Sequence, residues 1–138
     1  MKLSTRIMVF GTFDILHKGH LNFFKQARAL SKKPFLIVSV ARDINVKKIK
    51  GHKPINCEKK RFMKVKALKF VDKTVLGGIK NHIPHIIKEK PDVIALGYDQ
   101  KKYVQNLKSD LTKRGLNVKI KRLKAFMPQI YKSSLINK

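Results

Sequence analysis

Cysteine, acidic side chains and long apolar runs are all scarce in this chain, and each scarcity narrows what the protein can be. The single cysteine, Cys57, excludes an intrachain disulfide and a zinc site built from several cysteines. No apolar run approaches the ~20 residues that are needed to cross a bilayer. The N-terminal apolar run is too short for a secretory signal and lacks a small-residue cleavage site. We therefore expect a cytoplasmic protein. The 138 residues, 43% of them hydrophobic, predict one domain over residues 1–138.

The shortage of acidic residues leaves the chain strongly basic. There are 8 Asp and Glu residues against 33 Lys and Arg, which gives a formal net charge of +25. Such an excess favours polyphosphate ligands, nucleic acids or anionic membrane surfaces. However, the lysines are spread along the whole chain, with no basic and aromatic interleaving and no zinc-finger spacing. We therefore interpret most lysines as solvated surface residues, and expect neither a nucleic acid nor a membrane as a partner.

Short β-like runs alternate with segments of helical periodicity. The pattern predicts strands over residues 7–10, 35–41, 71–76, 93–96 and 118–123, and helices over 20–30, 58–69, 81–90 and 101–113, with a last helix from Ser133. Residues 42–57 are expected to form a basic loop, and Asn56 to cap the helix that follows. This order predicts an α/β fold: a single Rossmann-like, doubly wound parallel sheet of about five strands with helices on both faces. Ligands of such sheets bind beyond the carboxyl ends of the strands.

The end of the first predicted strand carries the most informative motif, FGTFDILHKGH over residues 10–20. Gly11 allows a tight turn, and His17 and His20 then open an amphipathic helix. A spacing of three puts both imidazoles on one helix face, beside unpaired backbone N–H groups and the positive end of the helix dipole. Such a place binds phosphate. The alternative is a helix start with two incidental histidines.

This motif resembles the G-T-F-D-x-x-H-x-G-H element of the cytidylyltransferase-like nucleotidyltransferases. All of its fixed positions are present: Gly11, Thr12, Phe13, Asp14, His17, Gly19 and His20. The resemblance implies that His17 and His20 contact a nucleoside triphosphate and stabilise charge on its α-phosphate while pyrophosphate leaves. It also implies a phosphate cradle that includes Gly11, Thr12 and Phe13. Asp14 either assists a hydrated magnesium ion or holds the loop.

Two further segments resemble substrate-binding parts of the same family. Arg42, Asp43 and Lys50 fall in the segment that receives the phosphate of the acceptor substrate, and Lys50 matches its recurrent lysine. Arg61 matches an arginine that family members place near the triphosphate. A lysine on a loop can follow the phosphoryl group through the reaction. The alternative for Lys47, Lys48 and Lys53 is a solvated basic surface.

Two C-terminal segments complete the implied nucleotide site. Gly97 and Asp99 follow the fourth predicted strand, where the family recognises base and ribose. Ser133 and Ser134 resemble its hydroxyl-rich helix start, which would donate to phosphate or only cap a helix. The arginine that often precedes this element is absent from its usual place.

Within the superfamily, the phrases GTFDILH, VKKIKG and LGYDQ are most similar to the archaeal-type FAD synthases. The resemblance implies transfer of AMP from ATP to FMN with release of pyrophosphate, a divalent cation, Mg²⁺, carried with the nucleotide, and a homodimer as one option. A glycerol-3-phosphate cytidylyltransferase that uses CTP is the alternative, because no single residue reads adenine against cytosine. A nucleic-acid-binding protein on a catalytically idle scaffold is the third hypothesis.

The arrangement of the histidines along the sequence does not indicate a metal site. His17, His20, His52 and Cys57 lack the spacing of a zinc site, so no metal ligand is predicted. His82 and His85 flank Pro84, and we expect both at a helix surface.

Overall fold

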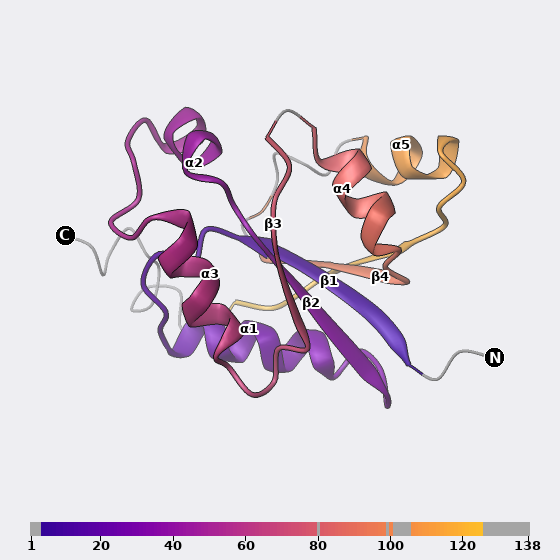
Figure 1. Cartoon of the computed structure of the whole chain (residues 1–138). Coiled ribbons are helices and arrows are strands. Elements are labelled where there is room, and N and C mark those ends of the chain that lie inside the picture. The colour runs from indigo at the N-terminus through magenta and orange to yellow at the C-terminus, as the bar shows by residue number, and fades with distance from the viewer. Residues whose placement is uncertain (1–3, 80, 99, 101–105, 126–138) are drawn as a thin grey trace.

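The computed structural model describes residues 4–79, 81–98, 100 and 106–125, and its centre is a twisted parallel sheet (Figure 1). The strands are β1 (Thr5–Gly11), β2 (Pro34–Val40), β3 (Lys73–Leu76), β4 (Val93–Leu96) and β5 (Lys119–Arg122). Their order is β3-β2-β1-β4-β5, and every neighbouring pair is parallel. The predicted doubly wound, Rossmann-like α/β fold is confirmed, with strand boundaries within about two residues of those expected.

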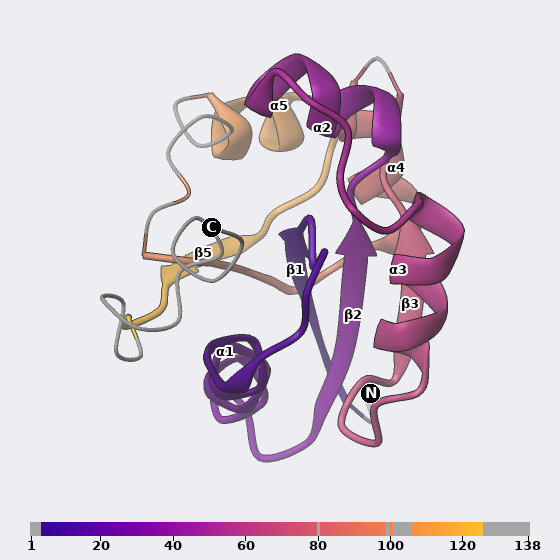
Figure 2. The same ribbon diagram turned by 90° about the vertical axis from the view of Figure 1, so that its left-hand side faces the viewer.

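Helices cover both faces of this sheet (Figure 2). The helices are α1 (Lys18–Arg28), α2 (Asp43–Lys50), α3 (Glu58–Lys66), α4 (His82–Glu89) and α5 (Leu107–Lys113). Strand residues alternate between two apolar clusters, as a pleated sheet requires. Leu36 and Val38 of β2 belong to the cluster under α1 and α3, whereas Ile37 belongs to the cluster under α4 and α5. None of the described helices is long and apolar enough to cross a bilayer.

The expectation that residues 42–57 form only a loop was wrong, because α2 occupies the first half of this segment. Asp43 lies in the first turn of α2 and three lysines in its last turn, as the helix dipole favours. Gly51 ends the helix with a φ of 81°, in the left-handed region that favours glycine. Val46 is its only buried residue, so the apolar stripe was too thin to predict a helix.

The predicted cap of α3 was also wrong. Cys57 is the N-cap of that helix and makes no capping hydrogen bond through its side chain. The side-chain amide of Asn56 instead donates to the backbone carbonyl of Asp14, 2.7 Å away. By contrast, Asn81, which was expected to be the first residue of the next helix, is the N-cap of α4 and accepts from the Ile83 N–H at 3.0 Å. The helix expected from Ser133 lies outside the described residues.

Candidate active site

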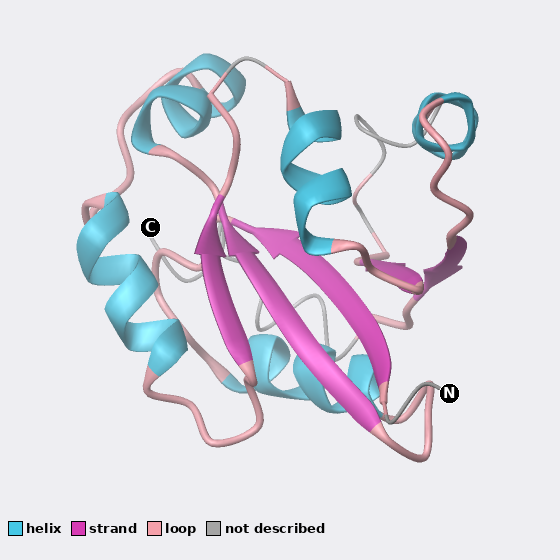
Figure 3. Cartoon of the chain, turned by 45° about the vertical axis from the view of Figure 1, so that its right-hand side comes forward, coloured by secondary structure: helices cyan, strands magenta, loops and turns pink. Residues whose placement is uncertain are grey.

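The sheet order reverses at β1, between β2 and β4, and that switch point is where ligands bind in open α/β sheets. The parallel arrangement brings the ends of β1, β2, β4 and β5 to one edge, as predicted (Figure 3). Gln100 bridges the first and fourth strands there: its amide donates to the Phe10 carbonyl at 2.7 Å and accepts from the Gly97 N–H at 2.8 Å. Arg122 donates to the Gly97 and Gln100 carbonyls. Sequence analysis missed both Gln100 and Arg122.

The turn after β1 is held in a strained conformation by its phenylalanine. Phe13 has a φ of 53°, is 3% exposed, and packs its ring 5.3 Å from that of Phe24. A Cβ on Gly11 would lie 2.6 Å from the Phe13 ring, closer than real contacts allow. Glycine is therefore required at position 11 in this conformation. The turn brings the backbone of residues 11–13 to the carboxyl edge of the sheet.

His17 and His20 cap α1 through their own side chains. The Nδ1 atom of His17 accepts from the Gly19 N–H at 3.0 Å, and the Nδ1 atom of His20 accepts from the His17 N–H at 3.3 Å. This reciprocal pattern is a capping box in which imidazoles replace the usual hydroxyl and carboxylate. The two rings lie 4.0 Å apart between centroids. Because Nδ1 accepts a hydrogen bond in both rings, each neutral ring carries its proton on Nε2.

Both imidazoles favour the neutral form. Burial lowers the pKa of His17, and it lowers the pKa of His20 to about 4, with the charges of His17 and Lys50 acting in the same direction. A hydrogen bond to the Ile15 backbone opposes this effect at His20. The pair thus presents neutral rings at the positive end of the α1 dipole, where an anion would be stabilised without a fixed positive charge.

Asp14 holds the turn after β1 against the segment before α3. It is 8% exposed, and its two carboxylate oxygens accept from the Ile55 N–H at 2.7 Å and the Asn56 N–H at 2.8 Å. Of the two roles considered for Asp14, these contacts describe the loop-holding one.

Arg61 lies behind the turn and is fully buried. Its guanidinium donates to the carbonyls of Thr12 (2.9 Å) and Ala41 (2.7 Å), and its Nε donates to the Asn56 carbonyl (2.9 Å). An ion pair of 2.6 Å joins it to Asp43. These contacts connect the loops after β1 and β2 to α3, so the geometry describes Arg61 as a support of the cradle.

A second cation–carboxylate contact fixes the start of α2. Glu58, the first residue of α3, accepts from the Asp43 N–H at 3.0 Å and from Arg42 at 3.1 Å. Arg42 also donates to the Gly77 carbonyl at 2.8 Å. Glu58 therefore supplies the N-terminal cap that α2 lacks in its own sequence. No local pattern could have indicated it, because the capped residue lies fifteen positions earlier in the chain.

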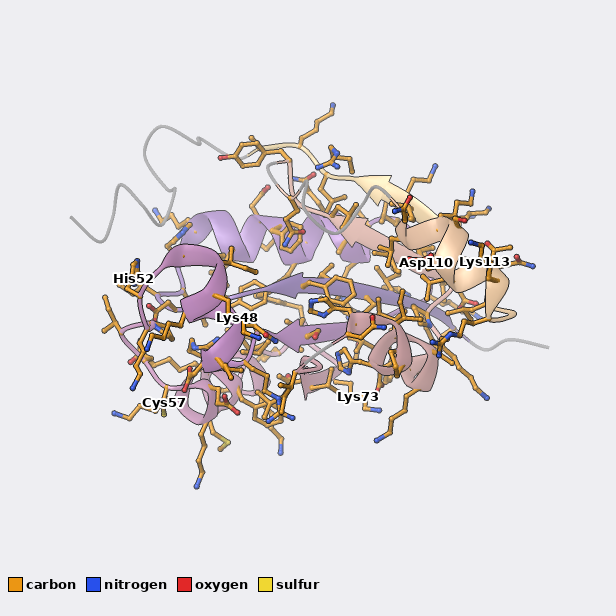
Figure 4. The ribbon with its side chains drawn as sticks, turned by 90° about the horizontal axis from the view of Figure 1, so that it is seen from above. Lys48, His52, Cys57, Lys73, Asp110 and Lys113 are labelled. Carbon is orange, nitrogen blue, oxygen red and sulfur yellow. The ribbon has the colours of Figure 1, made fainter. Side chains whose placement is uncertain are left out.

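Lys50 is the last residue of α2, is exposed, and lies close enough to lower the pKa of His20. The structure thus brings Lys50 toward the histidine pair. Lys48 and His52 lie at the same end of the molecule, opposite Asp110 and Lys113 (Figure 4). Asp99, Ser133 and Ser134 lie outside the described residues. Among the residues that the structure describes, no group of three or more His, Cys, Asp or Glu side chains is placed to hold a metal ion.

Comparison with known proteins identifies relatives over most of the chain. Residues 8–138 match the model of the cytidylyltransferase-like family. The chain is 47% identical over 91% of its length to the FAD synthase of Korarchaeum cryptofilum, covering 86% of that protein. It is 46% identical over 88% of its length to the FAD synthase of Methanosarcina mazei, covering 78% of that protein.

Solved structures share the architecture. A lipopolysaccharide core biosynthesis protein from Thermoplasma volcanium matches this chain with a TM-score of 0.80 and 39% sequence identity. The match covers 88% of this chain and 98% of the chain in that structure. A pantoate-beta-alanine ligase from Francisella tularensis, at a TM-score of 0.56 and 19% identity, shares the fold alone; the match covers 89% of this chain and 60% of the ligase.

Proposed function

The chain belongs to the cytidylyltransferase-like family, and on that premise we propose that it is a nucleotidyltransferase that transfers AMP from ATP to FMN, forming FAD and pyrophosphate. Its similarity to archaeal FAD synthases over most of both chains supports this substrate pair. The single structural observation that carries the proposal is the histidine capping box at the N-terminus of α1, which faces the switch point of the sheet.

The reaction requires alignment and charge stabilisation more than acid–base chemistry. An oxygen of the FMN phosphate attacks the α-phosphorus of ATP, the bond from that phosphorus to the bridging oxygen breaks, and pyrophosphate leaves with the electron pair. The attacking oxygen is already anionic, so no general base is needed. We assign His17 and His20 to the triphosphate, where their Nε2–H groups donate as charge develops on the α-phosphate and the leaving group.

Cations around the turn complete the proposed site. Lys50 neutralises the approaching acceptor phosphate from α2, and the backbone of Gly11, Thr12 and Phe13 lines the triphosphate. Gly97 packs against the nucleoside at the end of β4. Arg61, Asp43 and Arg42 act as positioning residues, because both guanidinium groups donate to backbone carbonyls and the Asp43 carboxylate accepts from Arg61. Asp99, Ser133 and Ser134 are assigned to the nucleotide on the resemblance alone.

The divalent cation enters with the substrate. Both oxygens of Asp14 accept backbone N–H groups, so the described residues fit an ion held mainly by triphosphate oxygens and water. We propose Mg²⁺ in this role, where it neutralises phosphate charge. A cytoplasmic location and a homodimer are further parts of the proposal.

A two-by-two assay tests the proposed function. The purified protein is incubated with ATP or CTP and with FMN or glycerol 3-phosphate, in the presence of Mg²⁺, and pyrophosphate and the nucleotide product are measured. We expect FAD from ATP and FMN and little product from the other three pairs. Turnover confined to CTP and glycerol 3-phosphate would instead identify a cytidylyltransferase. Absence of product from all four pairs would contradict nucleotidyl transfer.

A further inference from the structure

A second imidazole pair lies at the start of α4, on the face of the sheet opposite α1. His82 and His85 are three residues apart, as are His17 and His20. The Nε2 atom of His85 lies 2.8 Å from the hydroxyl of Ser39, which is 3% exposed, and the ring of His82 meets that of Phe10 edge-on at 6.4 Å. Both histidines are half-buried against the sheet. The expectation that they lie at a helix surface holds in part, because each is partly exposed while part of its ring contacts the sheet.

The turn at residues 11–13 lies between the two imidazole pairs. Phe10 directly precedes Gly11, and its ring packs beside His82 on the α4 face. Phe13 is the last residue of the turn, and its ring meets that of His20 at 5.4 Å on the α1 face. A phosphate bound at residues 11–13 would thus have one pair on each side.

In an in-line phosphoryl transfer, the two sides of the turn would face different groups. The attacking and leaving oxygens lie roughly opposite each other across the phosphorus. If the leaving pyrophosphate lies at the N-terminus of α1, the acceptor must approach from the other side of the turn. Both α4 and α5 lie on that side, and the start of α4 carries the ring that contacts Phe10, the residue before Gly11.

The start of α4 is also joined to the basic helix α2. The side-chain amide of Asn45 donates to the Gly78 carbonyl at 2.7 Å, and Arg42 donates to the Gly77 carbonyl at 2.8 Å. Figure 3 shows α2 beside the connection from β3 to α4 above the ends of the strands. One tied unit therefore offers the lysines of α2 for an acceptor phosphate and the rings of α4 for the remainder of the acceptor.

The chemistry of this second pair suits an uncharged aromatic ring better than another phosphate. Burial lowers the pKa of His82, and it lowers that of His85 although the nearby Glu89 carboxylate opposes it. Neutral imidazoles offer a flat face together with a hydrogen-bond donor or acceptor. An isoalloxazine ring presents a planar face and an edge of carbonyl and N–H groups, whereas glycerol phosphate has no such face.

Resting on the proposed function, we infer that His82 and His85 bind the isoalloxazine ring of FMN and select a flavin over a phosphorylated polyol as the acceptor. The buried hydroxyl of Ser39 orients His85 through its hydrogen bond to Nε2. Phe10 supports His82 through an edge-on ring contact.

The test compares the variants His82→Ala and His85→Gln with Lys88→Ala. Glutamine at position 85 keeps a partner for the Ser39 hydroxyl, and Lys88 is an exposed residue of the same helix. For each variant, KM for FMN and for ATP is measured, together with FMN affinity from quenching of its fluorescence. We expect KM and Kd for FMN to rise roughly tenfold in both histidine variants, as loss of one contact of about 1.4 kcal/mol gives. KM for ATP should change less than about twofold, as should every constant of Lys88→Ala.

Thermal unfolding of each variant shows whether the fold is intact. If wild-type protein forms FAD but folded His82→Ala and His85→Gln bind FMN normally, or lose FMN and ATP affinity equally, the inference is overturned and the proposed function stands. If the wild-type protein forms no FAD from ATP and FMN, the proposed function fails, and the inference with it.

Discussion

At the scale of single residues, His17 and His20 each use Nδ1 on the backbone of α1, which determines what Nε2 presents. Because Nδ1 accepts a backbone N–H, the neutral ring must carry its proton on Nε2. The low pKa of His20, about 4, keeps it neutral at pH 7. A bound triphosphate would raise the pKa of both rings, since a nearby negative charge favours imidazolium. The capping role and the proposed ligand role therefore reside on different nitrogens of the same side chains.

Amide side chains can separate these two roles. In His17→Asn and His20→Gln, the amide oxygen can still accept the backbone N–H, as Asn and Gln do in caps, but the imidazole Nε2–H donor is lost. We expect turnover to fall by about 10²–10³, the usual effect of losing one donor that stabilises developing charge. The free energy of unfolding should change by less than about 1 kcal/mol. Steady-state kinetics and urea unfolding measure the two effects.

A matched control is Lys25→Ala, at an exposed position in the last turn of α1. It should retain wild-type turnover and stability. Wild-type turnover in both amide variants would remove the histidines from the mechanism. A loss of turnover that the loss of folded protein fully accounts for would mean that the pair serves only as a helix cap.

At the scale of elements, the first turn of α3 connects the loops that form the site. Glu58 caps α2, and Arg61 donates to three carbonyls that precede it in the chain, two from before α2 and one from after α2. The turn after β1 and the start of α2 are thus held by one helix. A buried guanidinium with four hydrogen bonds is a rigid support, because little freedom remains for it to move toward a ligand.

Replacing Arg61 tests this support. Arg61→Met should lower the free energy of unfolding by about 3 kcal/mol, because three carbonyls and the Asp43 carboxylate lose their partner. Lys60→Met removes one exposed charge from the same turn and should cost less than about 0.5 kcal/mol. Urea unfolding of both variants makes the comparison. An Arg61→Met variant of normal stability that only raises KM for ATP would place the guanidinium on the triphosphate instead.

Elements also show where sequence-based prediction reached its limit. The strands were predictable because β-branched runs bury both faces in a parallel sheet. Helix α2 was not, since it buries only Val46 and obtains its cap from Glu58, fifteen residues later. Gln100 and Arg122 are likewise joined to the site by contacts that no local pattern contains. For His82 and His85, periodicity alone did not show that α4 turns them toward Ser39 and Phe10.

At the scale of the whole molecule, the strand order determines where the turn after β1 lies relative to the helices, which the motif alone does not show. Parallel strands bring four loops to one edge, and the reversal at β1 leaves the turn at residues 11–13 between two helical layers. The sequence alone predicts that the histidine motif binds phosphate, and this stays a prediction. The position of the turn at residues 11–13 between the layers of α1 and α4 required the three-dimensional order of the strands.

The whole molecule should lose stability in mild acid because its buried histidines resist protonation. Burial lowers the pKa of His17, His82 and His85, and that of His20 falls from 6.5 to about 4. Between these two values the unfolded chain binds more protons than the folded one, so the free energy of unfolding decreases as pH falls from about 6.5 to about 4. His20 alone contributes roughly 3 kcal/mol to this decrease.

Urea unfolding across this pH range measures the decrease, and His20→Gln should flatten part of it, whereas Lys25→Ala should keep the wild-type slope. Below about pH 4 the contribution of His20 is complete, because both states are then protonated at that ring. A net charge of +25 at pH 7 rises further in acid, and its self-repulsion acts in the same direction. A stability that is unchanged from pH 7 to about 4, or that rises, would contradict the burial of these rings.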